Sequence, residues 1–274
     1  MPELPELEVL RRSLEPHLVG ERIERARVWN GALREPVDRR KLARATRGRQ
    51  IMALGRRAKY LLLELEQGST LVIHLGMSGR LTLVPASAPR ETHEHLGFFL
   101  ASGRRLRFRD PRRFGLVLAL PSRTLERDRH FRHLGVEPLV HGFDGGRLAA
   151  LARGRRAPVK SFLMDGRLVV GLGNIYATEA LFRSGIHPAR SVARISRKRW
   201  ERLARSVRET LEQAIAEGGT TLNDFTDGEG RAGDFQVSLA VYGRDGAACP
   251  RCGKPVRRIV QAGRSSFYCP GCQR

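Results

Sequence analysis

The start of the chain places a proline and a glutamate where they could do covalent chemistry. A methionine that precedes a small residue such as Pro2 is readily removed, which would leave Pro2 as the first residue. A free Pro2 is a secondary amine, and its attack on a sugar carbon gives an iminium ion that withdraws electrons as a lysine Schiff base does. Glu3 could give and take protons beside it. The structural alternative is an acidic helix N-cap with prolines that favour the first turn.

The four cysteines have the spacing of a zinc site. Two C-x-x-C pairs lie near the end of the chain, and they comprise Cys249, Cys252, Cys269 and Cys272. Paired motifs at this separation are typical of four-cysteine zinc sites. Zinc is favoured over disulfides in a reducing cytoplasm, where we expect the protein because the first twenty residues lack the apolar segment of a signal peptide. Four thiolates fill a tetrahedral site, so we predict one structural Zn²⁺ without a catalytic role.

The charge of the chain favours a polyanionic partner. Lysine and arginine number 50 against 28 aspartates and glutamates, so the formal net charge is +22 over 274 residues. This excess is spread along the chain, as is typical of proteins that bind nucleic acid. The sequence has no apolar run of 18 residues, so we expect no membrane-spanning helix and no membrane partner.

The first half of the chain predicts one helix followed by a series of short strands. Leu4, Leu7, Leu10 and Leu14 recur at helical spacing, and we expect this helix to end or kink at Pro16. A short helix is expected near residues 38–45. The expected strands are 22–28, 50–54, 60–65, 70–74, 80–84, 98–100, 106–108 and 116–120. Short strands in series predict a β-sandwich or barrel.

The second half predicts helices, one long loop and a hairpin. The expected helices are 144–152, 158–164, one from Asn174 to the residue before Gly185, and 196–217. Residues 218–236 have no periodicity, and a loop of this length is usually functional. A hairpin of strands 257–261 and 265–268 would place Ala262, Gly263 and Arg264 at its tip. The fold class is α+β, with domains 1–132, 133–240 (including the loop 218–236) and 241–274.

The motifs resemble those of a known family along nearly the whole chain. They are PELPE, RRAKYLLLEL, HLGMSG, DPRRFG, GLGNIYATEALF, GGTTL, VYGR and the paired C-x-x-C. Together they resemble the bacterial formamidopyrimidine-DNA glycosylases. The resemblance implies an N-terminal helix on a β-sandwich, a helical domain with a helix–two-turns–helix motif and a zinc β-hairpin. It also implies a monomeric, cytoplasmic glycosylase and abasic-site lyase that excises 8-oxoguanine and formamidopyrimidines from damaged double-stranded DNA in base excision repair.

The resemblance assigns catalytic roles to four residues. Pro2 would attack C1′ of the damaged nucleotide, with Glu3 as acid/base partner and Glu6 as support. The Pro2 iminium would acidify the C2′ hydrogen and so permit β- and then δ-elimination. Lys59 would assist elimination and hold a phosphate, although a lysine beside an apolar strand is also common as a snorkelling surface residue. Arg264 would hold phosphates beside the lesion and assist the last elimination, unless it is only an exposed tip residue.

The resemblance also assigns DNA contacts. Met77, Arg112 and Phe114 match the three side chains that the family inserts into DNA, where they would refill the space of an extruded base. The alternative for Met77 and Phe114 is a place in the core, which the flanking glycines of their motifs disfavour. The further expected DNA-binding residues are His93, Arg155, Lys160, Asn174, Tyr242 and Arg264.

Three of these contacts have features of their own in the sequence. The family usually has an aspartate after the residue that matches His93, where this chain has Glu94. Asn174 opens a helix after two glycines, a natural phosphate site, and it could equally cap that helix. Arg155 lies in a run of arginines that could be a solvated surface.

Two other functions fit parts of the sequence. One is a sister glycosylase for oxidised pyrimidines with the same scaffold and nucleophile, which GGTTL, DPRRFG and the long glycine-rich loop disfavour. The other is a zinc-ribbon DNA-binding protein without chemistry. Excision assays and borohydride trapping separate these functions from the purine-specific enzyme.

Overall fold

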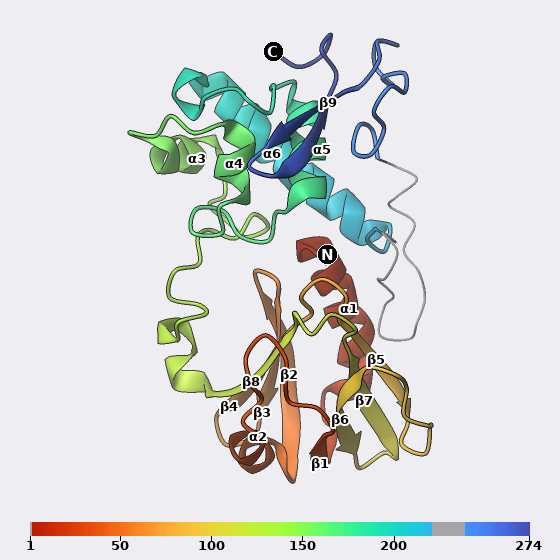
Figure 1. The fold of residues 1–274 in the computed structure, drawn as a ribbon. Helices are drawn as coiled ribbons and strands as arrows, with labels where there is room; N and C mark the ends of the chain where they lie inside the picture. Colours follow the sequence, from red (N-terminus) through yellow and green to blue (C-terminus); the bar gives the residue numbers. More distant parts are fainter. Residues whose placement is uncertain (1, 221–238) are drawn as a thin grey trace. The chain divides into compact units, whose positions relative to one another are not determined.

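The computed structural model describes residues 2–220 and 239–274, which form two compact units (Figure 1). Of the described residues, the first unit comprises 2–132 and 217–220, and the second comprises 133–216 and 239–274. Met1 and most of the predicted loop 218–236 lie outside the described residues. The predicted three-domain division of the chain stays a prediction. No helix in the described ranges is long and apolar enough to cross a membrane.

The first unit opens with helix α1 (Leu4–Leu18), which buries one apolar face. Leu7, Leu10 and Leu14 lie in the hydrophobic core, as their spacing predicts. The helix continues two residues past Pro16, beyond its expected end. Pro16 lies in the last turn, where a proline removes a single hydrogen bond. The N–H of Val19 then closes the helix on the carbonyl of Glu15.

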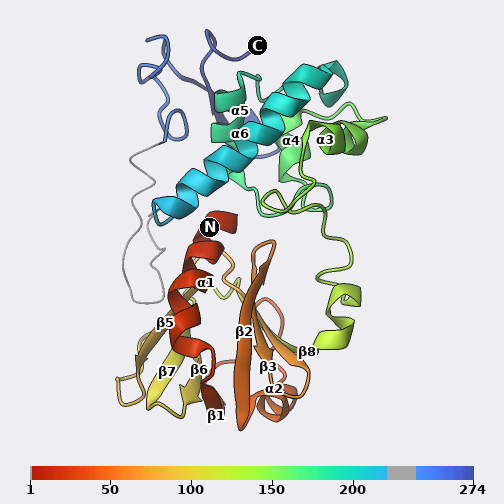
Figure 2. The same ribbon diagram turned by 180° about the vertical axis from the view of Figure 1, so that it is seen from behind.

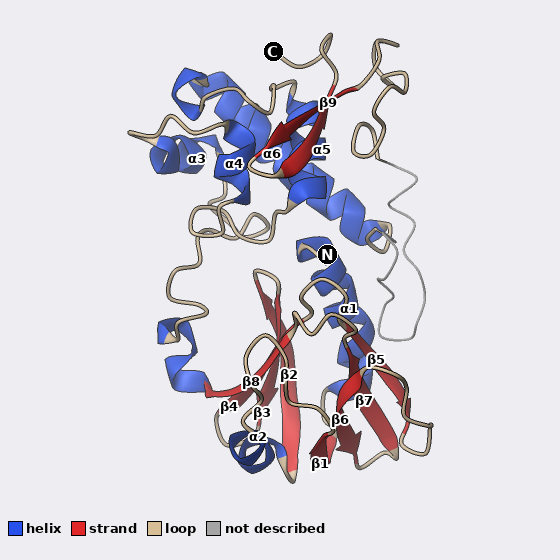
Figure 3. Ribbon diagram, viewed as in Figure 1, coloured by secondary structure: helices blue, strands red, loops and turns tan. Residues whose placement is uncertain are grey.

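Eight antiparallel strands form the rest of the first unit, in the spatial order β5-β7-β6-β1-β2-β3-β4-β8 (Figure 3). They are β1 (Arg22–Val28), β2 (Arg49–Arg57), β3 (Tyr60–Leu65), β4 (Ser69–His74), β5 (Arg80–Pro85), β6 (Glu94–Leu100), β7 (Arg104–Arg109) and β8 (Leu116–Pro121). Core side chains come from both halves of this sheet, among them Leu63 and Ile73 from one and Phe98 and Phe108 from the other. The predicted β-sandwich is confirmed.

Two short helical elements complete the first unit. Helix α2 (Arg39–Thr46) begins after Asp38, whose side chain accepts the N–H of Lys41 as a cap. The 3₁₀ turn η1 (Ser122–Arg127) follows β8.

The second unit is helical (Figure 2) and carries a two-stranded hairpin near its C-terminus (Figure 3). Its elements are α3 (Gly145–Ala152), α4 (Val159–Met164), α5 (Asn174–Ser184), the 3₁₀ turn η2 (Val192–Arg194), α6 (Arg197–Ala216), β9 (Arg257–Gln261) and β10 (Arg264–Tyr268). Asp144 caps α3, because its side chain accepts the N–H of Arg147. Helix α6 packs on α3 and α5 through its apolar face, which includes Leu203, Val207 and Leu211. The predicted helical domain and zinc hairpin are confirmed.

Candidate functional site

Helix α1 begins with two buried carboxylates beside Pro2. Pro2 is itself buried, and Glu3 and Glu6 are only 2% and 1% exposed. Glu6 Oε2 accepts the N–H of Glu3 at 2.7 Å, and Glu6 Oε1 accepts both the N–H and the hydroxyl of Thr220 at 3.0 Å. Glu6 therefore fixes the first residues of the helix in one position.

Thr220 is a partner of the site that the sequence did not single out. It lies 214 residues from Glu6, so no local sequence pattern predicts the contact. The only sequence signal at Thr220 is its place in the GGTTL motif. Gly219 precedes it with a φ of +80°, and a Cβ there would come within 3.2 Å of Glu6 Oε1. A glycine is therefore needed for the close approach of this segment to Glu6.

Lys59 lies in a turn and not in a strand. Arg57 and Tyr60 pair with each other, so Ala58 and Lys59 form the two-residue turn between β2 and β3. Ala58 has a φ of +53°, as one of the tight hairpin turns requires. The half-buried Lys59 is close enough to His74 for its charge to lower the pKa of that imidazole.

His74 is a neutral hydrogen-bond acceptor at the end of β4. Burial, followed by the charges of Arg34 and Lys59, lowers its pKa from 6.5 to about 3. Its Nδ1 accepts the N–H of Gly76 at 2.9 Å, which an unprotonated nitrogen can do. This bond holds the turn that precedes Met77.

The stability of the first unit should therefore fall on acidification through His74. The unfolded imidazole takes up a proton below pH 6.5, whereas the folded one does so only near pH 3. The expected loss is about 1.5 kcal/mol in the free energy of unfolding between about pH 6.5 and pH 5. His74→Asn can still accept the N–H of Gly76 but cannot titrate, so its urea unfolding should show a weaker dependence over that range. An unchanged dependence would contradict the assignment.

Met77, Arg112 and Phe114 come together on two neighbouring loops. Met77 is 40% exposed and Phe114 43% exposed, so the alternative that they are core residues is wrong. The guanidinium carbon of Arg112 lies 4.8 Å from the centre of the Phe114 ring. The two loops adjoin, because Ser78 Oγ accepts the N–H of Arg112. We call these three exposed side chains, two apolar and one cationic, the wedge.

His93 is exposed at the end of a loop whose backbone carbonyls accept hydrogen bonds from arginines of β7. Arg105, Arg107 and Arg109 alternate along the strand and donate to the carbonyls of Ala88, Pro89 and Thr92. His93 has a φ of +66°, a conformation that few side chains adopt. The backbone of the loop is therefore held in one shape up to the residue that would contact DNA.

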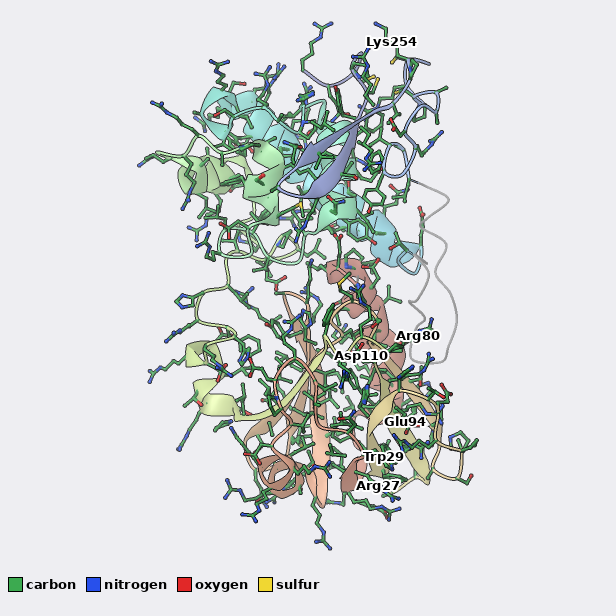
Figure 4. All side chains as sticks on the ribbon, viewed as in Figure 1. Arg27, Trp29, Arg80, Glu94, Asp110 and Lys254 are labelled. Atoms are coloured by element: carbon green, nitrogen blue, oxygen red, sulfur yellow. The ribbon has the colours of Figure 1, made fainter. Side chains whose placement is uncertain are left out.

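Glu94 lies between the arginines of this arrangement, and Figure 4 labels its position in the first unit. It is fully buried, and its carboxylate lies 3.3 Å from Arg105 Nε and 3.0 Å from Arg107 Nε. It also accepts the N–H of Glu91 at 3.1 Å. Glu94 therefore forms two buried ion pairs at this position.

Removing the charge of Glu94 should destabilise the first unit strongly. Glu94→Gln would leave two buried guanidinium groups without a carboxylate between them, at an expected cost of about 3 kcal/mol. The matched control is Glu91→Gln, since Glu91 also pairs with Arg107 but its side chain is 51% exposed. That change should cost less than about 1 kcal/mol. Equal losses in urea unfolding of the two variants would contradict the central role of Glu94.

In the second unit, Lys160 and Asn174 meet the zinc hairpin. Lys160 is only 2% exposed, and its Nζ donates to the Ser265 carbonyl at 2.9 Å and to the Ser266 hydroxyl at 2.7 Å. Asn174 Nδ2 donates to the same Ser265 carbonyl at 3.0 Å. Asn174 is not the cap of α5, because Gly173 occupies that position without a side-chain bond.

Arg264 is the first residue of β10 and not a residue of the tip. It pairs with Gln261, so only Ala262 and Gly263 form the turn, with φ values of +46° and +72°. Arg264 is exposed and lines a cavity of about 280 Å³ together with Lys160. The structure therefore brings together Lys160, Asn174 and Arg264, three residues that the sequence singled out for DNA contact.

Tyr242 and Arg155 lie elsewhere in the second unit. The Tyr242 ring packs edge-on against Phe267 of the hairpin with centroids 5.3 Å apart. The N–H groups of residues 240–242 all donate to Glu179, which the sequence did not identify. Burial raises the pKa of Glu179. Arg155 is exposed and lines a separate groove of about 610 Å³ with three more arginines, Arg153, Arg156 and Arg197.

The four cysteines form a compact metal site. Their sulfur atoms all lie within 4.8 Å of one another, with Cys249 and Cys272 at 3.9 Å and Cys252 and Cys269 at 3.4 Å. Zinc–sulfur bonds of about 2.3 Å in a tetrahedron place sulfurs about 3.8 Å apart, so the residues fit zinc. A backbone hydrogen bond from Lys254 lowers the pKa of Cys252 to about 7. These four cysteines hold one structural Zn²⁺.

Comparison with known families covers most of the chain. Residues 1–117 match the formamidopyrimidine-DNA glycosylase N-terminal domain, residues 134–226 match the H2TH domain of the same enzyme, and residues 246–274 match a zinc finger found in FPG and IleRS. The chain is 52% identical over 274 residues to the formamidopyrimidine-DNA glycosylase of Halorhodospira halophila. It is 50% identical over 276 residues to that of Marinobacter nauticus. Each alignment covers all of both chains.

Solved structures agree with these relatives. A complex of Lactococcus lactis Fpg with DNA containing an abasic site has a TM-score of 0.91 and 33% identity to this chain, and the alignment covers 99% of both. A complex of the same protein with DNA containing Fapy-dG has a TM-score of 0.91 and 33% identity, and the alignment covers 99% of this chain and 100% of the other.

Proposed function

The chain belongs to the formamidopyrimidine-DNA glycosylase family, and we propose from this that it excises oxidised purines from double-stranded DNA and then cuts the strand. Its substrates would be 8-oxoguanine and formamidopyrimidines, and its role would be base excision repair. The observation that carries the proposal is the buried start of α1, where Glu6 holds Glu3 beside Pro2. Such a fixed amine and acid can act on one sugar carbon.

In the proposed reaction, the Pro2 nitrogen attacks C1′ of the damaged nucleotide while the bond from C1′ to the base breaks. Glu3 gives and takes the protons that base departure and sugar-ring opening require. The resulting iminium acidifies a C2′ hydrogen, so loss of that proton expels the 3′ phosphate. A second elimination expels the 5′ phosphate, and water then releases the sugar fragment from Pro2.

Other residues would support this chemistry by their charge. Lys59 would hold a phosphate and, as a nearby cation, would disfavour protonation of the Pro2 amine. Lys160, Asn174 and Arg264 would bind phosphates at the hairpin, where they lie together. Their position supports this contact, because the exposed Arg264 lines the same cavity as the buried Lys160. His93, Arg155 and Tyr242 would add contacts at the surface.

The wedge would stabilise the DNA from which a base has been extruded. Base extrusion costs a few kcal/mol because stacking is lost. Met77 and Phe114 are exposed apolar side chains that could occupy the vacated space, and Arg112 could bond the base left without a partner. We further propose that the protein acts in the cytoplasm as a monomer without a membrane partner, and its charge of +22 supports DNA as its partner.

The test is excision from matched duplexes followed by borohydride reduction. A duplex with 8-oxoguanine opposite cytosine should be cut faster than one with thymine glycol, and reduction should leave a stable protein–DNA adduct. Faster cutting of thymine glycol would favour the pyrimidine-specific sister enzyme. Binding without any adduct would favour a DNA-binding protein without chemistry.

A further inference from the structure

We propose that Asp110 is a positioning residue that joins the two loops of the wedge into one rigid unit. The inference rests on the proposed function, in which Met77, Arg112 and Phe114 fill the space of an extruded base. Asp110 touches none of the reacting atoms in that scheme, so its effect would come through the loops alone.

The two carboxylate oxygens of Asp110 bind different loops. Asp110 is fully buried directly after β7. Its Oδ1 accepts the hydroxyl of Ser78 at 2.7 Å, and its Oδ2 accepts the N–H of Gly115 at 2.8 Å. Ser78 Oγ in turn accepts the N–H of Arg112 at 3.1 Å. One carboxylate thus links the loop of Met77 to both sides of the loop of Arg112 and Phe114, through bonds that its charge strengthens.

The backbone of Asp110 is anchored from the opposite side. Its N–H donates to the carbonyl of His93 at 3.0 Å, and its carbonyl accepts the Nε2 proton of the buried His95 at 2.8 Å. Figure 4 labels Asp110 and Glu94 in this part of the first unit. Asp110 therefore has little freedom to shift, and the loops bound to its carboxylate share that constraint.

The two loops also touch backbone to backbone. Gly76 has a φ of +65°, and a Cβ there would lie 2.5 Å from the carbonyl carbon of Phe114. A Cβ on Gly115 would lie 3.0 Å from Asp110 Oδ2. Nothing larger than glycine fits at these two contacts, so the loops have one close arrangement in which the carboxylate can reach both.

This arrangement holds apolar side chains outside the core. Met77 and Phe114 are about 40% exposed, so core packing alone does not fix them. Hydrogen bonds from a buried carboxylate supply that order before DNA arrives, as support behind a binding site generally does. If the loops were loose, part of the binding free energy would be used to order them, and formation of the extruded complex would be less favourable.

The first readout is amide hydrogen exchange, which needs no activity. Ser78→Ala should raise exchange at the N–H of Arg112 and leave that of Gly115 protected. Asp110→Asn should raise exchange at Gly115, because the side-chain amide has one acceptor oxygen in place of two and lacks the charge that strengthens the bond. Asp38→Asn is the matched control, since an asparagine still caps α2 away from these loops, and it should change neither.

The second readout is cleavage of two substrates. Both Asp110→Asn and Ser78→Ala should lower excision of 8-oxoguanine from a duplex by about 10-fold or more. Both should leave strand cleavage at an abasic site in single-stranded DNA within about threefold of the wild type, because no base needs to be extruded there. If Asp110→Asn does not fold, Ser78→Ala is sufficient for both measurements.

Two results would overturn the proposal. The first is unchanged exchange at Arg112 and Gly115 in the folded variants, which would mean that the carboxylate does not hold the loops. The second is an equal loss on the duplex and single-stranded substrates, which would mean that Asp110 acts on the fold as a whole. Absence of duplex excision by the wild type would instead contradict the proposed function, and the exchange readout would still decide on Asp110.

Discussion

Insertion of one glutamate between Met1 and Pro2 should lower base excision and strand cleavage by about 10³-fold or more. Methionine is not removed before a large residue, so the Pro2 nitrogen would become an amide without a lone pair able to attack deoxyribose. The measurements are release of 8-oxoguanine, nicking of the duplex and the yield of borohydride-trapped adduct. In the uninserted protein, the mass of the trapped peptide should place the adduct on Pro2.

The control is a second proline in the same turn. Pro5 is buried in the first turn of α1, where it favours the helix but has no free nitrogen. Pro5→Ala should therefore stay within about threefold of the wild-type rates. The inserted protein should still bind a duplex with a reduced abasic site. Full nicking by the inserted protein, or a trapped peptide that carries the adduct on Lys59, would contradict the role of Pro2.

The sequence predicted the elements whose patterns are local. The bounds of β3 (Tyr60–Leu65) follow from a continuous apolar run, and α1 follows from leucines at helical spacing. Strands β6 and β7 are longer than predicted at the ends where Glu94 and Arg105 lie. These charged residues look like surface positions in a linear pattern, and only their pairing across the sheet allows them to be buried.

The contacts that fix the candidate site could not be predicted from the sequence either, because they join residues that lie far apart along the chain. Glu6 meets Thr220 across 214 residues, and Glu179 gathers three N–H groups about sixty residues further along the chain. Asp110 was visible only as part of a motif, because its partner Ser78 lies on another loop. Motifs identified the residues that would touch DNA, whereas the carboxylates that position them were found from the fold.

Loss of zinc should abolish tight DNA binding, because it should displace Lys160 as well as Arg264 from the positions in which we expect them to contact DNA. Cys269 belongs to a small buried cluster with Phe182 and Val241 that joins the hairpin to α5. A two-stranded hairpin is marginal in water, and structural zinc contributes about 10–16 kcal/mol to small metal domains, so this cluster alone should not hold the strands. Lys160 would then lose its hydrogen bonds to both hairpin serines and the position that they give its Nζ.

The expected result of Cys269→Ser, or of chelation, is a loss of at least about 100-fold in affinity for a duplex with an abasic-site analogue. Arg264→Ala is the comparison, since it removes one proposed phosphate contact with the metal site intact, and it should cost about 10-fold. Added zinc should restore the chelated protein but not Cys269→Ser. Equal losses for the two variants would mean that zinc affects DNA affinity only by positioning Arg264. Lys160 would then make no contribution to the effect of zinc on DNA binding.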